Sequence, residues 1–282
     1  MIGRISHHMT RVLVAAVLGS GACGGPSDAP PNAAAAEAGY FTGRITMRDG
    51  SPITLPGVTY KIKIAGVTAV GESNNLYPPI SPDGTFRLKL PKGLFYPSSG
   101  TITFPFEGKN YLVDFVPVNP VPGTRDGADG IMQNFIWQIS GPKPGTLNPD
   151  IRNKEDWFGI TMSVGFVPYG DDTQQSPTPM TEGTRLVFTF TPSTKLFDGS
   201  EAKPVTVERK WSESPSFSID AINDLPPANY AISGVAILPE GITKTLKLKE
   251  SYNVFKPTIT LTLAPYHSGS GVFMPDLYFV CP

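Results

Sequence analysis

Hydrophobic and polar residues alternate along much of the chain after residue 40. Between residues 60 and 64, tyrosine and isoleucine alternate with two lysines. Between residues 86 and 90, phenylalanine and leucine alternate with an arginine and a lysine. A period of two is typical of β-strands with one buried and one solvated face. Residues 40–141 show no helical periodicity, so the pattern predicts an all-β fold.

The spacing of turn residues supports several short strands in this first block. Asp49-Gly50, Pro56-Gly57 and Asp83-Gly84 are dipeptides that supply the backbone angles of tight turns. Further strands are predicted at residues 101–106, 111–116 and 135–139. We therefore expect residues 40–141 to form one β-sandwich.

A second block of alternating residues follows a break in the pattern. Residues 142–156 are rich in proline and glycine and then in charged residues, which predicts a linker. Residues 157–282 alternate again and are predicted to form a second β-sandwich. Its strands are expected at residues 159–167, 185–191, 205–210, 217–219, 230–238, 245–248 and 258–263.

The N-terminus has the pattern of a secretory signal peptide over residues 1–22. Charged residues up to Arg11 precede a seven-residue apolar run, and small residues lead to Cys23. The run is too short to span a bilayer. Residues 23–39 carry no large apolar side chain and are rich in Ala, Pro and Gly, which predicts a flexible tether.

The segment before Cys23 resembles the lipobox of bacterial lipoproteins, which implies that Cys23 is lipidated and holds the protein on a membrane face. Ser20 departs from the usual leucine, so cleavage by the general signal peptidase and secretion stay open. A disulfide with Cys281, the only other cysteine, is the structural alternative. Gly24 is not the aspartate that resembles an inner-membrane retention signal, which favours the outer membrane in a host with two membranes.

The first block is similar to the carboxypeptidase regulatory-like, or transthyretin-like, β-sandwich family. The residues that carry the similarity are Gly43-Arg-Ile-Thr, Gly50-Ser-Pro-Ile-Thr-Leu-Pro-Gly-Val58, Ser81-Pro-Asp-Gly-Thr-Phe-Arg-Leu88 and Leu90-Pro-Lys-Gly93. The order departs from the family after Gly93. The resemblance does not imply peptidase activity, because this domain is the accessory one in that family, and it says little about function, since one fold hosts many roles. The second sandwich is either a diverged domain of similar type or immunoglobulin-like.

Composition and charge exclude one class of partner. The 282 residues carry 23 Lys and Arg against 24 Asp and Glu, a net charge of −1. Basic residues are scattered singly and form neither a basic patch nor a tail, so no nucleic-acid binding is expected.

Candidate catalytic and metal-binding residues are few. His267 is the only histidine after the signal peptide, and it lies in a Gly/Ser loop where a solvated side chain is expected. Asp171 and Asp172 are the candidates for a glycoside hydrolase working with carboxylates alone. Asp126 and Asp129 have the oxygens that Ca²⁺ prefers, but their spacing indicates a turn-rich loop.

Aromatic residues offer the remaining route to a ligand. Alternation places Phe135, Trp137 and Ile139 on one face, which predicts that they are buried. Trp211 has polar neighbours on both sides and is the candidate ligand-binding residue, because aromatic rings stack on sugars. The sequence thus predicts a non-catalytic cell-envelope lipoprotein, without a metal or cofactor, that binds an envelope protein or polysaccharide. A carbohydrate-binding module is the main alternative, favoured by an exposed aromatic row on one sheet face.

Overall fold

The computed structural model describes residues 35–118, 120–150, 153, 156–167, 180–211, 218–250, 253–265 and 272–282. These residues form β-strands, turns and loops, so the all-β prediction is confirmed. None of them belongs to a helix long and apolar enough to cross a membrane. Ala34–Pro282 clusters as one compact unit.

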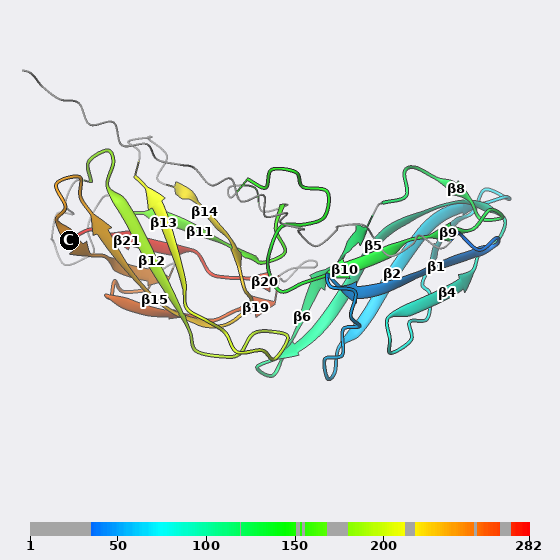
Figure 1. The fold of residues 1–282 in the computed structure, drawn as a ribbon, viewed down its shortest axis with the longest axis horizontal. Helices are drawn as coiled ribbons and strands as arrows, with labels where there is room; N and C mark the ends of the chain where they lie inside the picture. Colours follow the sequence, from blue (N-terminus) through cyan, green and yellow to red (C-terminus); the bar gives the residue numbers. More distant parts are fainter. Residues whose placement is uncertain are drawn as a thin grey trace, which may run out of the picture. The chain divides into compact units, whose positions relative to one another are not determined.

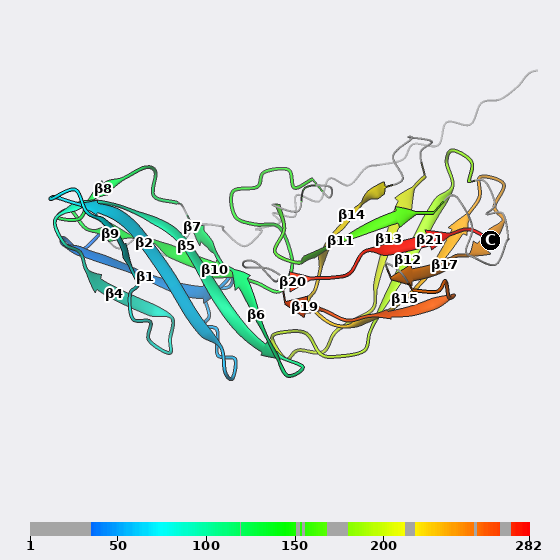
Figure 2. The ribbon, with the colours of Figure 1, turned by 180° about the vertical axis from the view of Figure 1, so that it is seen from behind.

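The strands up to residue 137 form two sheets (Figure 1). One sheet has the order β4-β1-β10-β7, with β9 added to β1, and the other has the order β3-β2-β5-β6, with β8 added to β5. The first sheet comprises β1 (Tyr40–Met47), β4 (Thr85–Lys89), β7 (Val116–Val118), β9 (Ile131–Met132) and β10 (Asn134–Trp137). The second comprises β2 (Thr59–Thr68), β3 (Ser73–Leu76), β5 (Gly93–Phe106), β6 (Lys109–Asp114) and β8 (Arg125–Asp126). Figure 2 shows β2 and β5 side by side from behind.

Strand β1 lies in the interior of its sheet and receives two short strands along one edge. It pairs in parallel with β9 and then with β10, and the ladder is interrupted at Gly43 and Gln133. The Asn134 side chain fills the gap by accepting a hydrogen bond from the Arg44 backbone N–H at 3.0 Å. Gly43 is needed here because an added Cβ would lie 2.0 Å from the Gln133 carbonyl oxygen.

The inner faces of these two sheets meet in an aromatic core. The ring centres of Phe104 on β5 and Trp137 on β10 are 4.6 Å apart, and both side chains are buried. Phe135 is buried as well, so the predicted burial of Phe135 and Trp137 is confirmed, whereas Ile139 follows the end of β10 and is only half-buried. On β2, Ile62 and Ile64 are buried, in agreement with the period-two pattern.

The strands from residue 160 onward also form two main sheets, with the orders β14-β11-β21-β17 and β13-β12-β15-β16, and β18 is added to β15. The first comprises β11 (Ile160–Phe166), β14 (Ser218–Leu225), β17 (Lys247–Glu250) and β21 (Leu277–Val280). The second comprises β12 (Arg185–Pro192), β13 (Val205–Lys210), β15 (Tyr230–Ile237), β16 (Thr243–Thr245) and β18 (Thr258–Leu261). A separate two-stranded ribbon pairs β19 (Ala264–Pro265) with β20 (Val272–Phe273). Phe188 on β12 and Phe279 on β21 bring the two main inner faces together, with ring centres 5.7 Å apart.

The two ends of the predicted linker lie side by side. The backbone N–H of Lys143 donates to the carbonyl of Asp156 at 2.7 Å, and that of Phe158 donates to the carbonyl of Gly141 at 3.0 Å. Pro142 and Trp157 form an isolated antiparallel bridge. The segment between them is therefore a closed loop, and the chain passes from β10 to β11 through a short paired connection.

Most predicted strands coincide with observed ones, but β3, the first part of β5, β21 and the two-residue strands β8, β9, β19 and β20 were not predicted. Strand β3 contains only one large hydrophobic residue, Leu76, and so gives no alternating pattern. Strand β5 starts at Gly93 and continues through residues expected to intervene between strands. Strand β21 has three buried residues among four and thus lacks a wet face. The predicted strand at 245–248 is split between β16 and β17, and that at 217–219 belongs to the longer β14.

Candidate functional site

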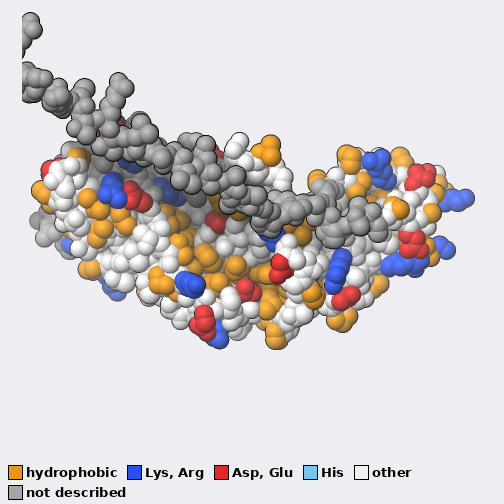
Figure 3. Space-filling view, viewed as in Figure 1, with side chains coloured by type: hydrophobic (Ala, Val, Ile, Leu, Met, Phe, Trp, Pro, Cys, Tyr) orange, Lys and Arg blue, Asp and Glu red, His pale blue; other side chains and the backbone are white. Residues whose placement is uncertain are grey.

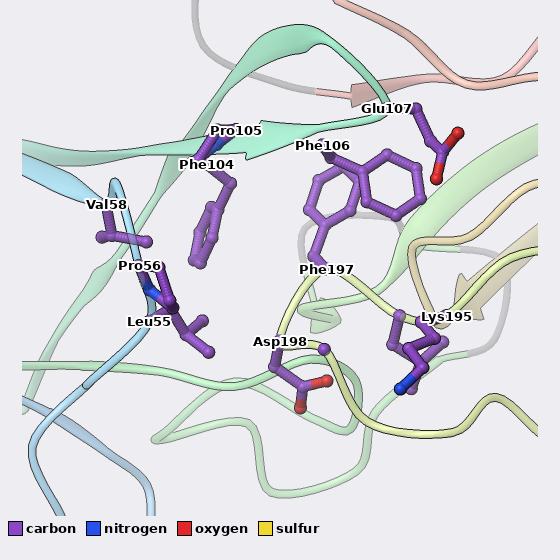
Figure 4. A pocket seen from close by; sticks show the side chains of 12 residues that line it. Leu55, Pro56, Val58, Phe104, Pro105, Phe106, Glu107, Lys195, Phe197 and Asp198 are labelled. Carbon is purple, nitrogen blue, oxygen red and sulfur yellow. The ribbon is translucent and has the colours of Figure 1, made fainter.

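The described residues offer two candidate binding surfaces, and the first is a cleft lined mainly by apolar side chains. It has a volume of about 350 Å³. Figure 4 shows its lining, which combines the 55–58 loop, the end of β5 and the loop between β12 and β13. The lining residues are Leu55, Pro56, Val58, Phe104, Pro105, Phe106, Glu107, Lys195, Leu196, Phe197, Asp198 and Gly199.

The loop between β12 and β13 inserts Phe197 into the aromatic residues of β5 and β6. The Phe197 ring centre lies 4.7 Å from that of Phe106, 4.9 Å from Tyr111 and 5.9 Å from Phe104. Only 5% of Phe197 is exposed. The loop presents this ring because a tight turn closes behind it, in which Asp198 Oδ1 accepts hydrogen bonds from the Ser200 backbone and hydroxyl.

A buried hydrogen bond lies beside this ring cluster. The Tyr111 hydroxyl donates to the carbonyl of Leu263 at 2.9 Å. The backbone N–H of Leu263 in turn donates to Asn229 Oδ1 at 2.9 Å. Burial raises the pKa of Tyr111, with a smaller contribution from the charge of Glu107, so the hydroxyl stays a donor at neutral pH.

Asp224, at the end of β14, binds the two ends of the closed loop. Its Oδ1 accepts hydrogen bonds from the backbone N–H groups of Gly141 at 2.7 Å and Gly159 at 3.1 Å. Burial raises the pKa of Asp224, and these two hydrogen bonds oppose the shift. The residue has a positive φ of 64°, a conformation that aspartate tolerates better than most side chains.

Packed aromatic side chains fill most of the cleft and limit what it can bind. Phe197 and its aromatic neighbours on β5 and β6 contact one another, and we call this contact the Phe197 joint. The open volume is the space that these packed rings leave unfilled. At its rim, Lys195 Nζ lies 3.0 Å from Glu201 and its charge is paired. This arrangement can hold an apolar group, but its main effect is to attach the β12–β13 loop to strands β5 and β6.

The second surface is the solvent face of the sheet β3-β2-β5-β6. Of the eight exposed large hydrophobic side chains among the described residues, three lie on strands of this sheet, one lies on its β2–β3 turn, and one directly follows β3. These five are Val67 (47% exposed), Val70 (80%), Tyr77 (49%), Leu94 (54%) and Tyr96 (44%). We call these five residues the tyrosine face.

The strand register and one ring contact show that four of these side chains share one face, and Val70 lies in the turn beside them. Residues paired across adjacent strands point to the same side of a sheet. Val67 pairs with Leu94, and Ala65 pairs with both Tyr96 and Asn75. The Lys61 ammonium lies 4.8 Å from the centre of the Tyr77 ring, which places Tyr77 on the same side as Lys61.

The candidate ligand-binding residue Trp211 is half-buried. Its ring packs edge-on against Phe166 with centres 4.9 Å apart, and its backbone N–H donates to the carbonyl of Thr184 at 2.7 Å. Trp157 is also half-buried and donates its indole N–H to the carbonyl of Asp150. The most exposed aromatic rings among the described residues are instead those of Tyr77 and Tyr96.

Other candidate residues have structural partners or lie elsewhere. Asp126 Oδ1 accepts a hydrogen bond from the backbone N–H of Ala128 at 2.9 Å, as in an ordinary turn. Across the described residues, no three His, Cys, Asp or Glu side chains are grouped as a metal site would need. Cys281 is a buried free cysteine, and burial raises the pKa of its thiol. The candidates that lie outside the described residues are Cys23, Asp171, Asp172 and His267, together with the signal peptide.

Charge gives no further candidate on the side of the molecule shown in Figure 3. Lysine and arginine are interspersed there with aspartate and glutamate, and no field of a single sign forms. This distribution agrees with the near-zero net charge.

Sequence reasoning missed both Phe197 and the two tyrosines. Phe197 lies in Lys195-Leu-Phe-Asp-Gly199, which has the composition of a turn, so nothing local indicates a buried ring. Tyr96 lies between Phe95 and Pro97, where large hydrophobic residues on both faces hide the alternation. A signal was present at Tyr77, a tyrosine that follows the polar Ser73-Asn-Asn75.

Comparison with known proteins gives little similarity. No protein-family profile matches the chain, and no curated protein matches it. Among solved structures, a leucine-rich repeat protein from Bacteroides thetaiotaomicron is 11% identical, with 79% of this chain and 24% of that chain covered and a TM-score of 0.22. The chain thus spans about a quarter of that protein.

Two further solved structures are similarly distant. A candidate adhesin from Bacteroides ovatus is 9% identical, with 79% of this chain and 83% of that chain covered and a TM-score of 0.21. A tetra-tandem repeat in the extending region of a large adhesion protein is 11% identical, with 85% and 66% covered and a TM-score of 0.17. All three TM-scores are too low to assign a fold or to support a functional argument.

Proposed function

We propose that this chain is a non-catalytic lipoprotein of the bacterial cell envelope with a binding or structural role. In this proposal, lipidated Cys23 anchors the chain to a membrane face, the outer membrane where the host has two, and residues 23–34 hold the folded body away from it. The folded body consists of two tandem β-sandwiches, of which the first belongs to the carboxypeptidase regulatory-like type. Its partner is an envelope protein or polysaccharide.

The observation that carries the structural part of this proposal is the insertion of Phe197. The ring packs among Phe104, Phe106 and Tyr111, and the Tyr111 hydroxyl reaches the carbonyl of Leu263. Tandem domains joined only by a linker are expected to move independently unless their interface is large and hydrophobic. A buried aromatic joint of this kind favours a body that unfolds as one unit and presents its surface in a fixed way.

Calorimetry of Phe197→Ala tests the role of this joint. Removing a buried phenylalanine costs about 3–5 kcal/mol, so we expect one thermal transition in the wild type and two in the variant. Leu147→Ala is the matched control, because Leu147 is 92% exposed. Two transitions already present in the wild type would contradict the proposed single body.

Labelling and fractionation test the proposed anchor separately. In cells fed a radioactive fatty acid, the wild-type chain should take up label and sediment with membranes. Cys23→Ser should remove the label and release the chain to the soluble fraction, because stable anchoring requires attached acyl chains. Membrane association that survives Cys23→Ser would overturn the lipoprotein assignment while leaving the role of the joint intact.

A further inference from the structure

The tyrosine face is the largest gathering of exposed hydrophobic side chains in the described part of the chain. Solvated sheet faces normally carry polar side chains, and contiguous apolar patches on soluble proteins mark binding surfaces. Val67 and Leu94 form a direct cross-strand pair, and Tyr96 is two residues from Leu94 on the same face. Val67, Leu94 and Tyr96 are therefore neighbours on one sheet face, which is a candidate binding surface.

We propose that the tyrosine face binds an extended, uncharged glycan, with sugar rings stacking on Tyr77 and Tyr96. This site adds a ligand class to the binding role proposed above. It is separate from the anchor and from the ring neighbours of Phe197, because its five residues lie between positions 67 and 96, whereas Phe197 packs on residues 104, 106 and 111.

The spacing of the two tyrosines suits a chain ligand. Tyr96 lies in the row of Ala65 and Asn75, and Tyr77 follows Asn75 by two residues. With strands about 4.8 Å apart and a rise of about 3.4 Å per residue, two strands and two residues separate the tyrosine Cα atoms by about 12 Å. A ligand that touches both rings must then be longer than one sugar, and the open sheet face leaves room for a chain.

The Tyr77 ring is held in place before any ligand arrives. The Lys61 ammonium lies 4.8 Å from the ring centre, within the range of a cation–π contact. Such a contact occupies one side of the ring, and Tyr77 still has 49% of its surface exposed. A pre-positioned ring loses less conformational entropy on binding.

Polar side chains beside the tyrosines can serve the hydroxyl groups of a sugar. Asn75 shares a row with Tyr96, and Ser73 shares a row with Val67 and Leu94. Within the described part of the chain, neither the Ser73 nor the Asn75 side chain makes a hydrogen bond. Both can therefore donate to and accept from a ligand.

The charges around this face favour an uncharged ligand. Lys61 and Lys63 lie on the solvent side of β2. Asp114 shares the row of Lys61 through Thr101, and Asp126 pairs with Leu94. Two lysines thus face two carboxylates, and a polyanion gains no net attraction.

A protein partner is the competing occupant, and the two can be separated by mutation. Sugars bind through the faces of aromatic rings together with hydrogen bonds. A protein interface would rely on the aliphatic Val67, Val70 and Leu94 as much as on the tyrosines. Asn75 and Ser73 add hydrogen-bonding groups beside the tyrosines and the aliphatic side chains, and stacking sugars need both kinds of contact.

Binding should be measured by affinity electrophoresis of the full chain in mild detergent. The probes are soluble β-glucan, xylan and galactomannan, with alginate as the anionic comparison. We expect saturable binding to a neutral polysaccharide and about tenfold weaker binding in Tyr77→Ala and in Tyr96→Ala. Tyr96→Phe keeps the ring and should retain most of the affinity.

Three control variants make the result specific. Val67→Thr and Leu94→Thr remove aliphatic surface only, and Trp211→Ala removes the other candidate ring, so all three should bind as the wild type does. Light scattering should show the same mass for every variant, and thermal melting should show the same stability for all of them except Trp211→Ala, because Trp211 is half-buried against Phe166 while the other side chains are exposed.

Several results would overturn the proposal. They are an absence of binding to every neutral probe, binding to alginate alone, and full binding by both tyrosine-to-alanine variants. Equal losses in Leu94→Thr would identify a general hydrophobic contact. A dimer in the wild type that Leu94→Thr converts to a monomer would assign the face to a second copy of the chain.

Discussion

Arg87 binds Glu37 with a two-pronged ion pair. Its Nε and Nη2 donate to the two carboxylate oxygens of Glu37 at 2.9 and 2.6 Å, and its guanidinium carbon lies 3.4 Å from the centre of the Tyr40 ring. The Gly39 backbone N–H also donates to the carbonyl of Ala128 at 2.9 Å. The last residues of the predicted tether are therefore attached to the first sheet.

This ion pair makes the attachment of residues 37–39 sensitive to pH. The hydrogen bond from Arg87 holds the pKa of Glu37 below its usual value of 4.5. The carboxylate therefore contributes above pH 4.5, and its contribution is lost as the pH falls through the lower folded-state pKa. We expect the hydrogen-exchange protection of the Gly39 amide to fall in that acid range, and Glu37→Gln to lower it already at pH 7.

A second exposed ion pair supplies the control for this experiment. Glu201→Gln removes the partner of Lys195 and should leave the protection of Gly39 unchanged. High salt should reduce the protection in the wild type, because exposed charges are screened. Protection that is the same in Glu37→Gln and the wild type would show that backbone hydrogen bonds alone hold the segment.

We expect the contribution of Asp224 to stability to depend on pH with the opposite sign. Its pKa is raised from 3.8 by burial, so the folded state binds more protons than the unfolded state at pH values just above 3.8. Its contribution to the free energy of unfolding therefore falls as the pH rises through that window. Asp224→Asn keeps an oxygen acceptor without the charge, and its stability relative to the wild type should improve between pH 4 and 7 in urea denaturation.

The alanine variant at this position separates charge from hydrogen bonding. Asp224→Ala leaves the N–H groups of Gly141 and Gly159 without their acceptor, which costs about 1–3 kcal/mol at every pH. The positive φ of residue 224 adds strain for alanine. Equal stability of the alanine and asparagine variants would refute the role given to the two hydrogen bonds.

Tyr111→Phe tests the hydrogen bond to Leu263. The ring contact with Phe197 remains, while the 2.9 Å bond to the Leu263 carbonyl is lost. We expect the free energy of unfolding to fall by about 0.5–1.5 kcal/mol in chemical denaturation. Tyr77→Phe is the matched control, since Tyr77 is exposed, and it should change stability by much less.

Gly43→Ala tests the interruption in the β1 ladder. The new methyl group would meet the Gln133 carbonyl oxygen at 2.0 Å and Phe86 at 2.5 Å, so strands β1 and β10 must separate locally. Overpacking of this kind costs about 1–3 kcal/mol or more. Calorimetry should show a lower melting temperature, and an unchanged one would mean that the gap opens freely.

Local pattern was enough to predict the class of fold but not its pairing. The alternation at Ile62 and Ile64 reports which side of β2 is buried, because both inner positions are apolar. It carries no information on which strand lies next to β2. The pairing of β1 with β10 joins residues about 90 positions apart, and that choice depends on the shape of the whole core.

The two surfaces differ in how visible they are in the sequence. An exposed tyrosine and a buried one have the same letter, so Tyr96 and Tyr111 are separated only by their neighbours in space. Trp211 has polar neighbours in the sequence, yet Phe166 covers part of its ring. Contacts between distant segments decide exposure, and a single sequence does not show them.

The position of β21 has a consequence for how the chain can fold as it is made. Residues 277–280 fill the place between β11 and β17, so that sheet has a gap until these residues are available. The strands up to residue 137 can pair earlier, since β10 supplies their last partner for β1. Between these two moments β11 has an open edge, a risk for aggregation that lasts until residues 277–280 have been made and have paired.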